Sequence, residues 1–348
     1  MRGIRHFALG CTLALSALAL TPGSSRAAEK AAGPTVGKPD KVALAHDKAQ
    51  LAFQRDLVSV LAPRADATPL LAAALLARPL HNQPRTSSFH DLIERAASAS
   101  DAGAAVEWLR LADCQAQADN CPNPAALQAL VLKAPDNAAV WLLKLGQDTR
   151  NMRQQDVRTD LSRAAAASTY DDYTGSSLKA LADYVSVLPP PASSYAHGLT
   201  AGPAGLQTML VYGLASAQPQ PVLPLVAQLC DNARDDASIK ADCLKLGKVL
   251  EWGSSPLAQS LGLHLRQVLS DDPAQQQEAK RARIDLIWQV QNFAELTARA
   301  RSDKALARNL LALARSGGTE MSIMLAALRE AGIAADAPAD WKPPQPAS

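Results

Sequence analysis

Aromatic residues are scarce in this chain of 348 residues. Phe, Trp and Tyr together make up 4% of it, whereas hydrophobic residues as a whole make up 48%. The hydrophobic content is therefore mostly Ala and Leu, which are strong helix formers, and β-branched residues are too few for a large sheet. The composition predicts an all-α protein whose small residues let helices pack closely.

A large charge of one sign is also missing. The formal net charge is +2, and removal of residues 1–27, which hold three arginines and no acidic residue, changes it to −1. Both signs are spread along the remaining chain, so the electrostatic signature of a protein that binds nucleic acid or anionic lipid is absent. We expect no nucleic-acid partner.

Long hydrophobic runs are confined to the N-terminus. Arg2 and Arg5 precede an apolar run over 7–20, and small residues then lead to Ala27, a pattern typical of a signal peptide cleaved near Ala27. No later run reaches the ~18 residues of a membrane span. We expect an exported protein, periplasmic or secreted, with no transmembrane span in the mature chain. Lipidation at Cys11 is the alternative, but the hydrophobic run follows this cysteine instead of preceding it.

Cysteines are few, and one of the five, Cys11, lies in the signal segment. The other four cysteines are an even number, which in an exported protein predicts two disulfides. Four cysteines can pair in three ways, and the spacing favours the pairs Cys114–Cys121 and Cys230–Cys243. Along one straight helix these partners would lie about 10 and 20 Å apart, whereas a disulfide needs Cα atoms within ~7 Å. Each pair must therefore span a turn. CxxC motifs and histidines near the mature cysteines are absent, so we expect no metal and no cofactor.

Proline marks the starts of many helices. Five times it directly follows a residue suited to cap a helix, an arrangement that favours a helix start: Thr68-Pro69, Asn123-Pro124, Gly202-Pro203, Ser255-Pro256 and Asp272-Pro273. Further candidate caps are Asp136, Ser176 and Thr319. Amphipathic runs predict helices over 41–61, 68–78, 87–100, 102–112, 124–133, 137–148, 154–167, 175–188, 203–217, 221–230, 237–251, 256–269, 273–300, 303–315 and 319–331.

Short connections predict that neighbouring helices pack antiparallel, and three irregular regions predict the domain boundaries. A polar lead-in over 28–40 precedes an N-terminal helical array over 41–188. The segment 189–202, which opens with Pro189 to Pro191, is a candidate hinge before a C-terminal array over 203–335. A Pro-rich tail over 336–348 ends the chain.

The stretch 123–170 resembles a tetratricopeptide repeat. Pro135-Asp136-Asn137 precedes a helix with Trp141, and Leu145-Gly146 follow as in that family, although Leu145 comes four residues after Trp141 where the family has three. No second copy recurs at a 34-residue period. The resemblance implies an α-solenoid-like array of stacked helical hairpins with a concave face for a protein or peptide, and it implies no chemistry.

Candidate functional residues form one polar cluster and several dispersed groups. Tyr170-Asp171-Asp172-Tyr173 is a possible binding cluster for a sugar, a cation or a basic peptide, and its alternative role is to cap the next helix. His197 lies in the candidate hinge, where functional residues concentrate. His90 followed by Asp91 is the arrangement of a base beside an acid, but adjacent helical residues do not face each other, which favours a surface histidine. His264 falls within an apolar run, which indicates a core or groove histidine.

Six arginines in the last three predicted helices form either a solvated basic face or a docking surface for an acidic partner: Arg281, Arg283, Arg299, Arg301, Arg308 and Arg315. The sequence contains no GxSxG, HExxH or P-loop motif. We therefore assign no catalytic residue and expect a non-enzymatic exported helical-repeat scaffold that binds a protein or peptide partner. The alternatives are a cell-envelope hydrolase of unfamiliar type, with its site near the central hinge, and a structural spacer.

Overall fold

A computed structural model describes residues 41–114, 121–195, 199–232 and 236–344, with the side chains of residues 41 and 42 left out. About 70% of the described residues are helical, and they form fifteen α-helices and no strand. The predicted all-α array is confirmed. The predicted signal peptide over 1–27 and the lead-in over 28–40 lie outside the described residues.

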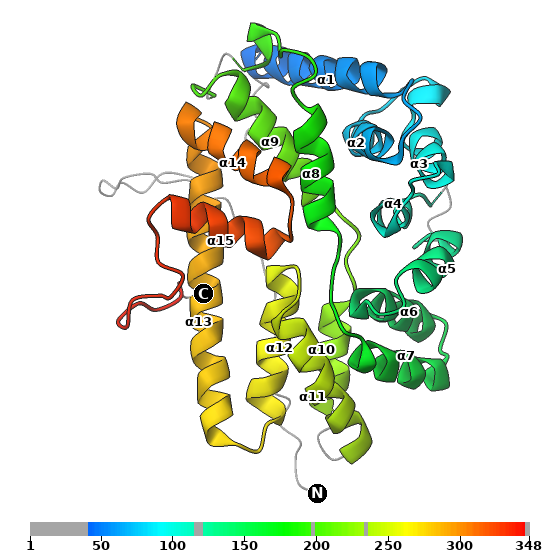
Figure 1. The fold of residues 1–348 in the computed structure, drawn as a ribbon, viewed down its shortest axis with the longest axis vertical. Coiled ribbons are helices and arrows are strands. Elements are labelled where there is room, and N and C mark those ends of the chain that lie inside the picture. Colours follow the sequence, from blue (N-terminus) through cyan, green and yellow to red (C-terminus); the bar gives the residue numbers. More distant parts are fainter. Residues whose placement is uncertain (1–40, 115–120, 196–198, 233–235, 345–348) are drawn as a thin grey trace, which may run out of the picture. The chain divides into compact units, whose positions relative to one another are not determined.

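The observed helices follow the predicted ones closely, and Figure 1 shows them coloured along the chain. Their bounds are α1 Lys41–Leu61, α2 Ala67–Ala77, α3 Phe89–Ser98, α4 Ala104–Arg110, α5 Pro124–Lys133, α6 Ala138–Arg150, α7 Gln154–Ala166, α8 Thr174–Tyr184, α9 Pro203–Ala215, α10 Leu223–Asn232, α11 Ala237–Glu251, α12 Pro256–Leu269, α13 Pro273–Arg299, α14 Lys304–Ser316 and α15 Glu320–Glu330. Two short 3₁₀ helices, Arg85–Ser87 and Ala192–Ser194, lie in the connections.

Most helices pack against their neighbours in sequence, as α1 does on α2, α6 on α7, and α11 on both α10 and α12. Other contacts join segments far apart in the chain. Helix α11 packs on α7, and α8 packs on α2. Helix α14 packs on α8 and α9, so the C-terminal helices contact the middle of the chain (Figure 1).

One hydrophobic core includes residues on both sides of the candidate hinge 189–202. Leu57 and Leu76 from the N-terminal region, Leu181 from α8 and Leu311 from α14 belong to the same buried cluster. The residues from Lys41 onward also form one compact unit. The division into arrays over 41–188 and 203–335 stays a prediction, and helices from both ranges share this core.

Two of the predicted proline-linked caps make the expected hydrogen bonds. The Asn123 side chain accepts hydrogen bonds from Ala125 N and Ala126 N, and the Asp272 side chain accepts one from Ala274 N at 2.8 Å. The predicted cap Thr319 also accepts a hydrogen bond, from Ser322 N at 3.1 Å. These side chains satisfy backbone N–H groups that have no partner within the helix.

Three helix starts differ from the predicted caps by one to three residues. Helix α2 starts at Ala67, before the predicted cap Thr68, because the Asp101 side chain accepts a hydrogen bond from Ala67 N at 2.9 Å. Asn137 caps α6 in place of Asp136, and Tyr173 precedes α8 in place of Ser176. Tyr173 adopts a left-handed backbone conformation, with φ 57°, which propensity does not predict for a tyrosine.

A buried ion-pair network joins α6 and α7 in the repeat-like stretch. Lys144 Nζ donates hydrogen bonds to Asp148 Oδ2 at 2.7 Å and to Asp160 Oδ1 at 3.0 Å. Burial, together with the neighbouring Asp148, raises the pKa of Asp160 to about 6 despite the Lys144 ammonium. On the same hairpin, Trp141 Nε1 donates a hydrogen bond to Pro135 O at 2.7 Å, and the Arg163 guanidinium lies 4.6 Å from the centroid of the Trp141 ring. These contacts fix α6 and α7 as a helical hairpin.

The described part of the predicted tail packs against α13. Ala337 N donates a hydrogen bond to Asp285 Oδ1 at 2.9 Å, and the Trp288 and Trp341 rings lie 5.4 Å apart in an edge-to-face arrangement. Among the described helices, none combines the length and apolar character that a membrane span requires.

Candidate functional site

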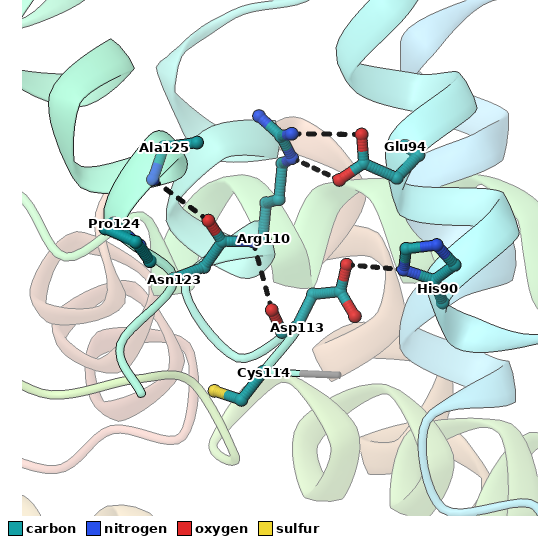
Figure 2. Close-up of a pocket in the computed structure, with 8 residues that line it drawn as sticks. All are labelled: His90, Glu94, Arg110, Asp113, Cys114, Asn123, Pro124 and Ala125. Carbon is teal, nitrogen blue, oxygen red and sulfur yellow. Dashed lines mark hydrogen bonds and ion pairs between the residues drawn. The ribbon is translucent and has the colours of Figure 1, made fainter. Parts of the chain in front are cut away.

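An open recess of about 460 Å³ lies between α3, α4 and the start of α5. Figure 2 shows the side chains that line it, which carry both charges, an imidazole and an amide: His90, Glu94, Arg110, Asp113, Cys114, Asn123, Pro124 and Ala125. Because several polar groups converge in one hollow, this recess is the best candidate site in the described part of the chain.

Helix α3 supplies two of these side chains from one face. Ser88 caps the helix and accepts a hydrogen bond from Asp91 N at 3.2 Å, so α3 begins two residues after the start of the helix predicted over 87–100. His90 and Glu94 are four residues apart, so they lie one turn apart on the same face. The opposite face is buried through Leu92 and Ile93.

His90 pairs with Asp113, and not with its sequence neighbour Asp91. His90 Nδ1 lies 2.8 Å from Asp113 Oδ2 (Figure 2), and the Asp113 residue is 6% exposed. Asn123 Nδ2 donates a hydrogen bond to Asp113 O at 3.0 Å, which fixes the backbone of this residue after α4. His90 Nε2 has no hydrogen-bond partner among the described residues, so this nitrogen remains for a ligand or water.

A second charged pair lies beside the first. Arg110 Nε donates a hydrogen bond to Glu94 Oε1 at 2.5 Å, and Arg110 Nη2 donates one to Glu94 Oε2 at 2.9 Å. Glu107, which is 3% exposed, accepts further hydrogen bonds from Arg110 at 3.3 Å and from Lys133 at 2.8 Å. Burial opposes the Arg110 charge, but the hydrogen bonds and negative charges of Glu94 and Glu107 outweigh it and raise the pKa of Arg110. The guanidinium is thereby held at a fixed position on the wall of the recess.

Three of the side chains offer atoms suited to a metal ion. One ligand atom each from His90, Glu94 and Asp113 lies within 4.8 Å of the others. The Arg110 guanidinium occupies both carboxylate oxygens of Glu94 in this arrangement. A cation would therefore compete with the Arg110 guanidinium for the Glu94 carboxylate.

A disulfide flanks the recess. Cys114 and Cys121 are paired with Cα atoms 5.2 Å apart, and Cys114 directly follows Asp113. The bond ties the end of α4 to the segment that starts α5, so it holds two walls of the recess together. The second pair, Cys230–Cys243, joins α10 to α11 with Cα atoms 5.8 Å apart, and both residues are fully buried. Both pairings agree with the prediction from spacing, and two disulfides fit an oxidising, exported environment.

The predicted cluster Tyr170-Asp171-Asp172-Tyr173 lies at an interior junction of three connections. Ser254 lies in the α11–α12 connection. Its backbone N donates a hydrogen bond to Tyr170 O at 3.0 Å, and its Oγ accepts a hydrogen bond from Asp172 N at 3.1 Å. Met321 N, at the start of α15, donates to Ser254 O at 3.0 Å. Tyr170 and Asp172 are 3% and 1% exposed.

The turn also serves the helix that follows it. Asp171 Oδ1 accepts a hydrogen bond from Tyr173 N at 2.8 Å, and Asp172 Oδ1 accepts one from Thr174 N at 3.2 Å. The Tyr173 ring lies 5.4 Å from that of Trp108, which is fully buried. These contacts match the alternative role as a helix cap, and a binding role for the four residues stays a prediction. His197 lies outside the described residues.

Several polar atoms at this junction have no hydrogen-bond partner among the described residues. They are Tyr170 OH, Asp172 Oδ2, Ser177 Oγ and Ser255 Oγ. Burial, with the nearby charge of Asp172, raises the pKa of Glu320 to about 7. A cavity of about 20 Å³ beside Glu320 has room for one water molecule.

Of the other histidines, His264 is partly exposed, and its Nε2 lies 3.3 Å from Asp231 Oδ1. The sequence pattern did not single out Glu94, Arg110 or Asp113. The spacing of His90 and Glu94 was a signal for a shared helix face, but nothing in the sequence connected either residue with Asp113.

Comparison with models of protein families, with curated proteins and with solved structures finds no match for this chain. The structure itself establishes an all-helical protein whose helices pack mainly on their sequence neighbours, with two cysteine pairs at disulfide distance.

Proposed function

We propose that the protein is an exported, non-enzymatic helical scaffold that binds a protein or peptide partner, and that the recess between α3, α4 and α5 is its binding site. The observation that carries this proposal is the arrangement of Arg110, Asp113 and Asn123 around one open hollow of about 460 Å³. A peptide brings carboxylates, ammonium groups and backbone amides, all of which find complementary groups there.

The recess is well prepared for binding because its charged groups are already fixed. Asp113 is anchored through His90 and Asn123, and Arg110 is held by Glu94 and Glu107. A partner therefore does not lose affinity through the ordering of these side chains. The Cys114–Cys121 disulfide adds to this rigidity by joining two walls of the recess.

The signal-peptide pattern at the N-terminus and the two disulfides support an extracytoplasmic location for this function. A signal peptide cleaved near Ala27 would deliver the chain to the periplasm or the medium, where disulfides persist. The resemblance of 123–170 to a tetratricopeptide repeat further supports partner binding, because arrays of such hairpins bind peptides.

Photo-crosslinking tests the proposal. A photoreactive amino acid replaces Ala125, an exposed residue that lines the recess, in the full chain expressed with its export segment. The matched control carries the same group at Ala52, an exposed residue on α1. We expect a defined crosslinked species from position 125 and none from position 52. Crosslinks that are absent at position 125, or identical at both positions, would refute the assignment of the site.

A cell-envelope hydrolase remains the second candidate, and the pairing of His90 with Asp113 favours it. A carboxylate at Nδ1 orients an imidazole so that Nε2 can act as a general base. Release of soluble fragments from cell-wall material by the wild-type chain, lost in His90→Gln but retained in His81→Gln, would establish this candidate in place of the scaffold.

A further inference from the structure

A second hollow, separate from the recess, lies between α9 and α14. Its volume is about 260 Å³, and its lining is a row of basic side chains over an apolar floor. The basic residues are Lys304, Arg308 and Arg315, and the floor includes Ala204 and Leu311, which are 7% and 3% exposed. We call this hollow the α9–α14 groove.

The three cations lie along one face of α14. Their positions differ by four and by seven residues, spacings that return to the same side of an α-helix. Lys304 and Arg308 are exposed, and none of the three forms an ion pair with any residue in the described ranges. The groove therefore carries positive charge that the described part of the protein does not neutralise.

The carboxylates that the structure describes near the groove bind other groups and do not pair with its three cations. Asp303 caps α14 by accepting hydrogen bonds from Ala305 N and Leu306 N, both at 3.0 Å. Asp183, on α8, pairs with Lys179 at 2.9 Å. Arg315 is positioned by hydrogen bonds from its Nε to Ala182 O at 2.9 Å and from its Nη2 to Ser186 Oγ at 2.8 Å. Those two acceptors are uncharged, so they hold the guanidinium without cancelling its charge.

We infer that the α9–α14 groove binds an acidic, extended peptide segment of the partner. From position 304 to position 315 the helix rises about 16 Å, which equals the length of about five extended residues. A single phosphate is too small to reach all three cations at once. A bilayer surface is flat and does not enter a groove, and nucleic acid is disfavoured by a net charge near zero. Side chains such as Glu, with an apolar stem and a carboxylate, suit both the floor and the row of cations.

This inference rests on the proposed function, since the acidic segment belongs to the partner, but it concerns a different surface. A fluorescent peptide with five consecutive Glu residues is titrated with the mature chain, and a matched peptide with five Gln residues is the reference. We expect the Glu peptide alone to bind, with an affinity that falls as salt rises. Arg308→Glu and Lys304→Glu should each weaken binding by about tenfold or more. Arg55→Glu, at an exposed position on α1, should leave the affinity within about twofold of the wild type.

Three results would overturn the inference. The first is equal binding of the Gln peptide, and the second is an equal loss of affinity in Arg55→Glu. The third is binding of phosphatidylglycerol vesicles that depends on Arg308 while the Glu peptide does not bind. The Arg110→Met variant separates the two proposals, because a change in the recess should not affect binding of the Glu peptide. Retained peptide binding without crosslinking at position 125 would refute the recess as the binding site and support the groove.

Discussion

Asp113 and His90 lie 23 residues apart in sequence, yet Asp113 Oδ2 lies 2.8 Å from His90 Nδ1. The pairing joins the end of α4 to the first turn of α3 and places a buried carboxylate at the back of the recess. Removal of the imidazole would leave Asp113 buried without its main side-chain partner.

The first prediction is that His90→Ala destabilises the protein by about 1–3 kcal/mol, the usual effect of leaving a buried polar group unsatisfied. Urea unfolding of the purified protein measures this change. His81→Ala, at an exposed position outside the recess, is the control and should change the free energy of unfolding by less than about 0.5 kcal/mol. Equal stabilities of the two variants would show that the His90–Asp113 pair does not stabilise the fold.

The second prediction concerns Glu320, whose pKa is raised to about 7 by burial and by Asp172. Between the ordinary glutamate pKa and pH 7, the folded state binds more protons at this site than the unfolded state does. The contribution of Glu320 to the free energy of unfolding should therefore be greatest below about pH 4. As the pH rises towards 8, the free energy of unfolding should fall by up to about 3 kcal/mol.

Glu320→Gln removes this proton-linked loss and should stabilise the protein at pH 8 but not at pH 4. Chemical denaturation across this pH range, for wild type and variant, makes the comparison. Asp160, whose pKa is raised to about 6, contributes in the same direction in both proteins and so cancels in the difference. If the free energies of unfolding of the wild type and Glu320→Gln change with pH in parallel, Glu320 is not the source of the pH dependence.

The third prediction concerns the close approach of α11 and α12 at Gly262. A Cβ atom at this position would lie 2.5 Å from Glu251 N and 2.7 Å from Gly247 O, both of them backbone atoms that cannot rotate away. Gly262→Ala should therefore destabilise the protein by about 2 kcal/mol or more, an effect of overpacking. Gly213, inside α9, has no atom within 4 Å of the position that a methyl group would take, so Gly213→Ala should stabilise by up to about 1 kcal/mol. Thermal unfolding distinguishes the two, and equal effects would contradict the packing of α11 on α12.

The fourth prediction concerns the Cys230–Cys243 pair, whose partners are 13 residues apart in sequence. Replacing both cysteines by Ser should lower the free energy of unfolding by about 2–3 kcal/mol, because the unfolded chain gains freedom. Denaturation with and without a reducing agent checks this. A reductant should destabilise the wild type, and it should destabilise the double variant less because only the Cys114–Cys121 bond remains. Identical curves for the wild type and the double variant would contradict a stabilising role for the bond.

The helices and disulfides were largely predictable because they depend on short-range patterns. Asn123-Pro124 and Asp272-Pro273 start helices as expected, since both the capping side chain and proline act within one turn. The cysteine pairs followed from spacing and from the need for a turn between partners. Helix α2 began earlier than predicted because a distant side chain, Asp101, satisfies its first N–H group.

The candidate site was not predictable because it depends on long-range contacts. His90 was noted in the sequence, but its partner Asp113 is brought to it only by the packing of α3 on α4. Tyr170 and Asp172 stood out as a polar cluster, yet burial against the 252–255 connection depends on tertiary structure that periodicity does not contain.

We propose that the recess binds a partner through its fixed charges. The most direct test is to measure the affinity of the protein for the partner segment that crosslinking at position 125 recovers. Titration calorimetry would compare the wild type with Arg110→Met, which keeps the apolar stem but removes the guanidinium, and with Arg55→Met as a matched control. We predict that Arg110→Met weakens binding by about tenfold or more while Arg55→Met binds like the wild type. Equal affinity of Arg110→Met and the wild type would contradict binding of the partner through the charges of the recess.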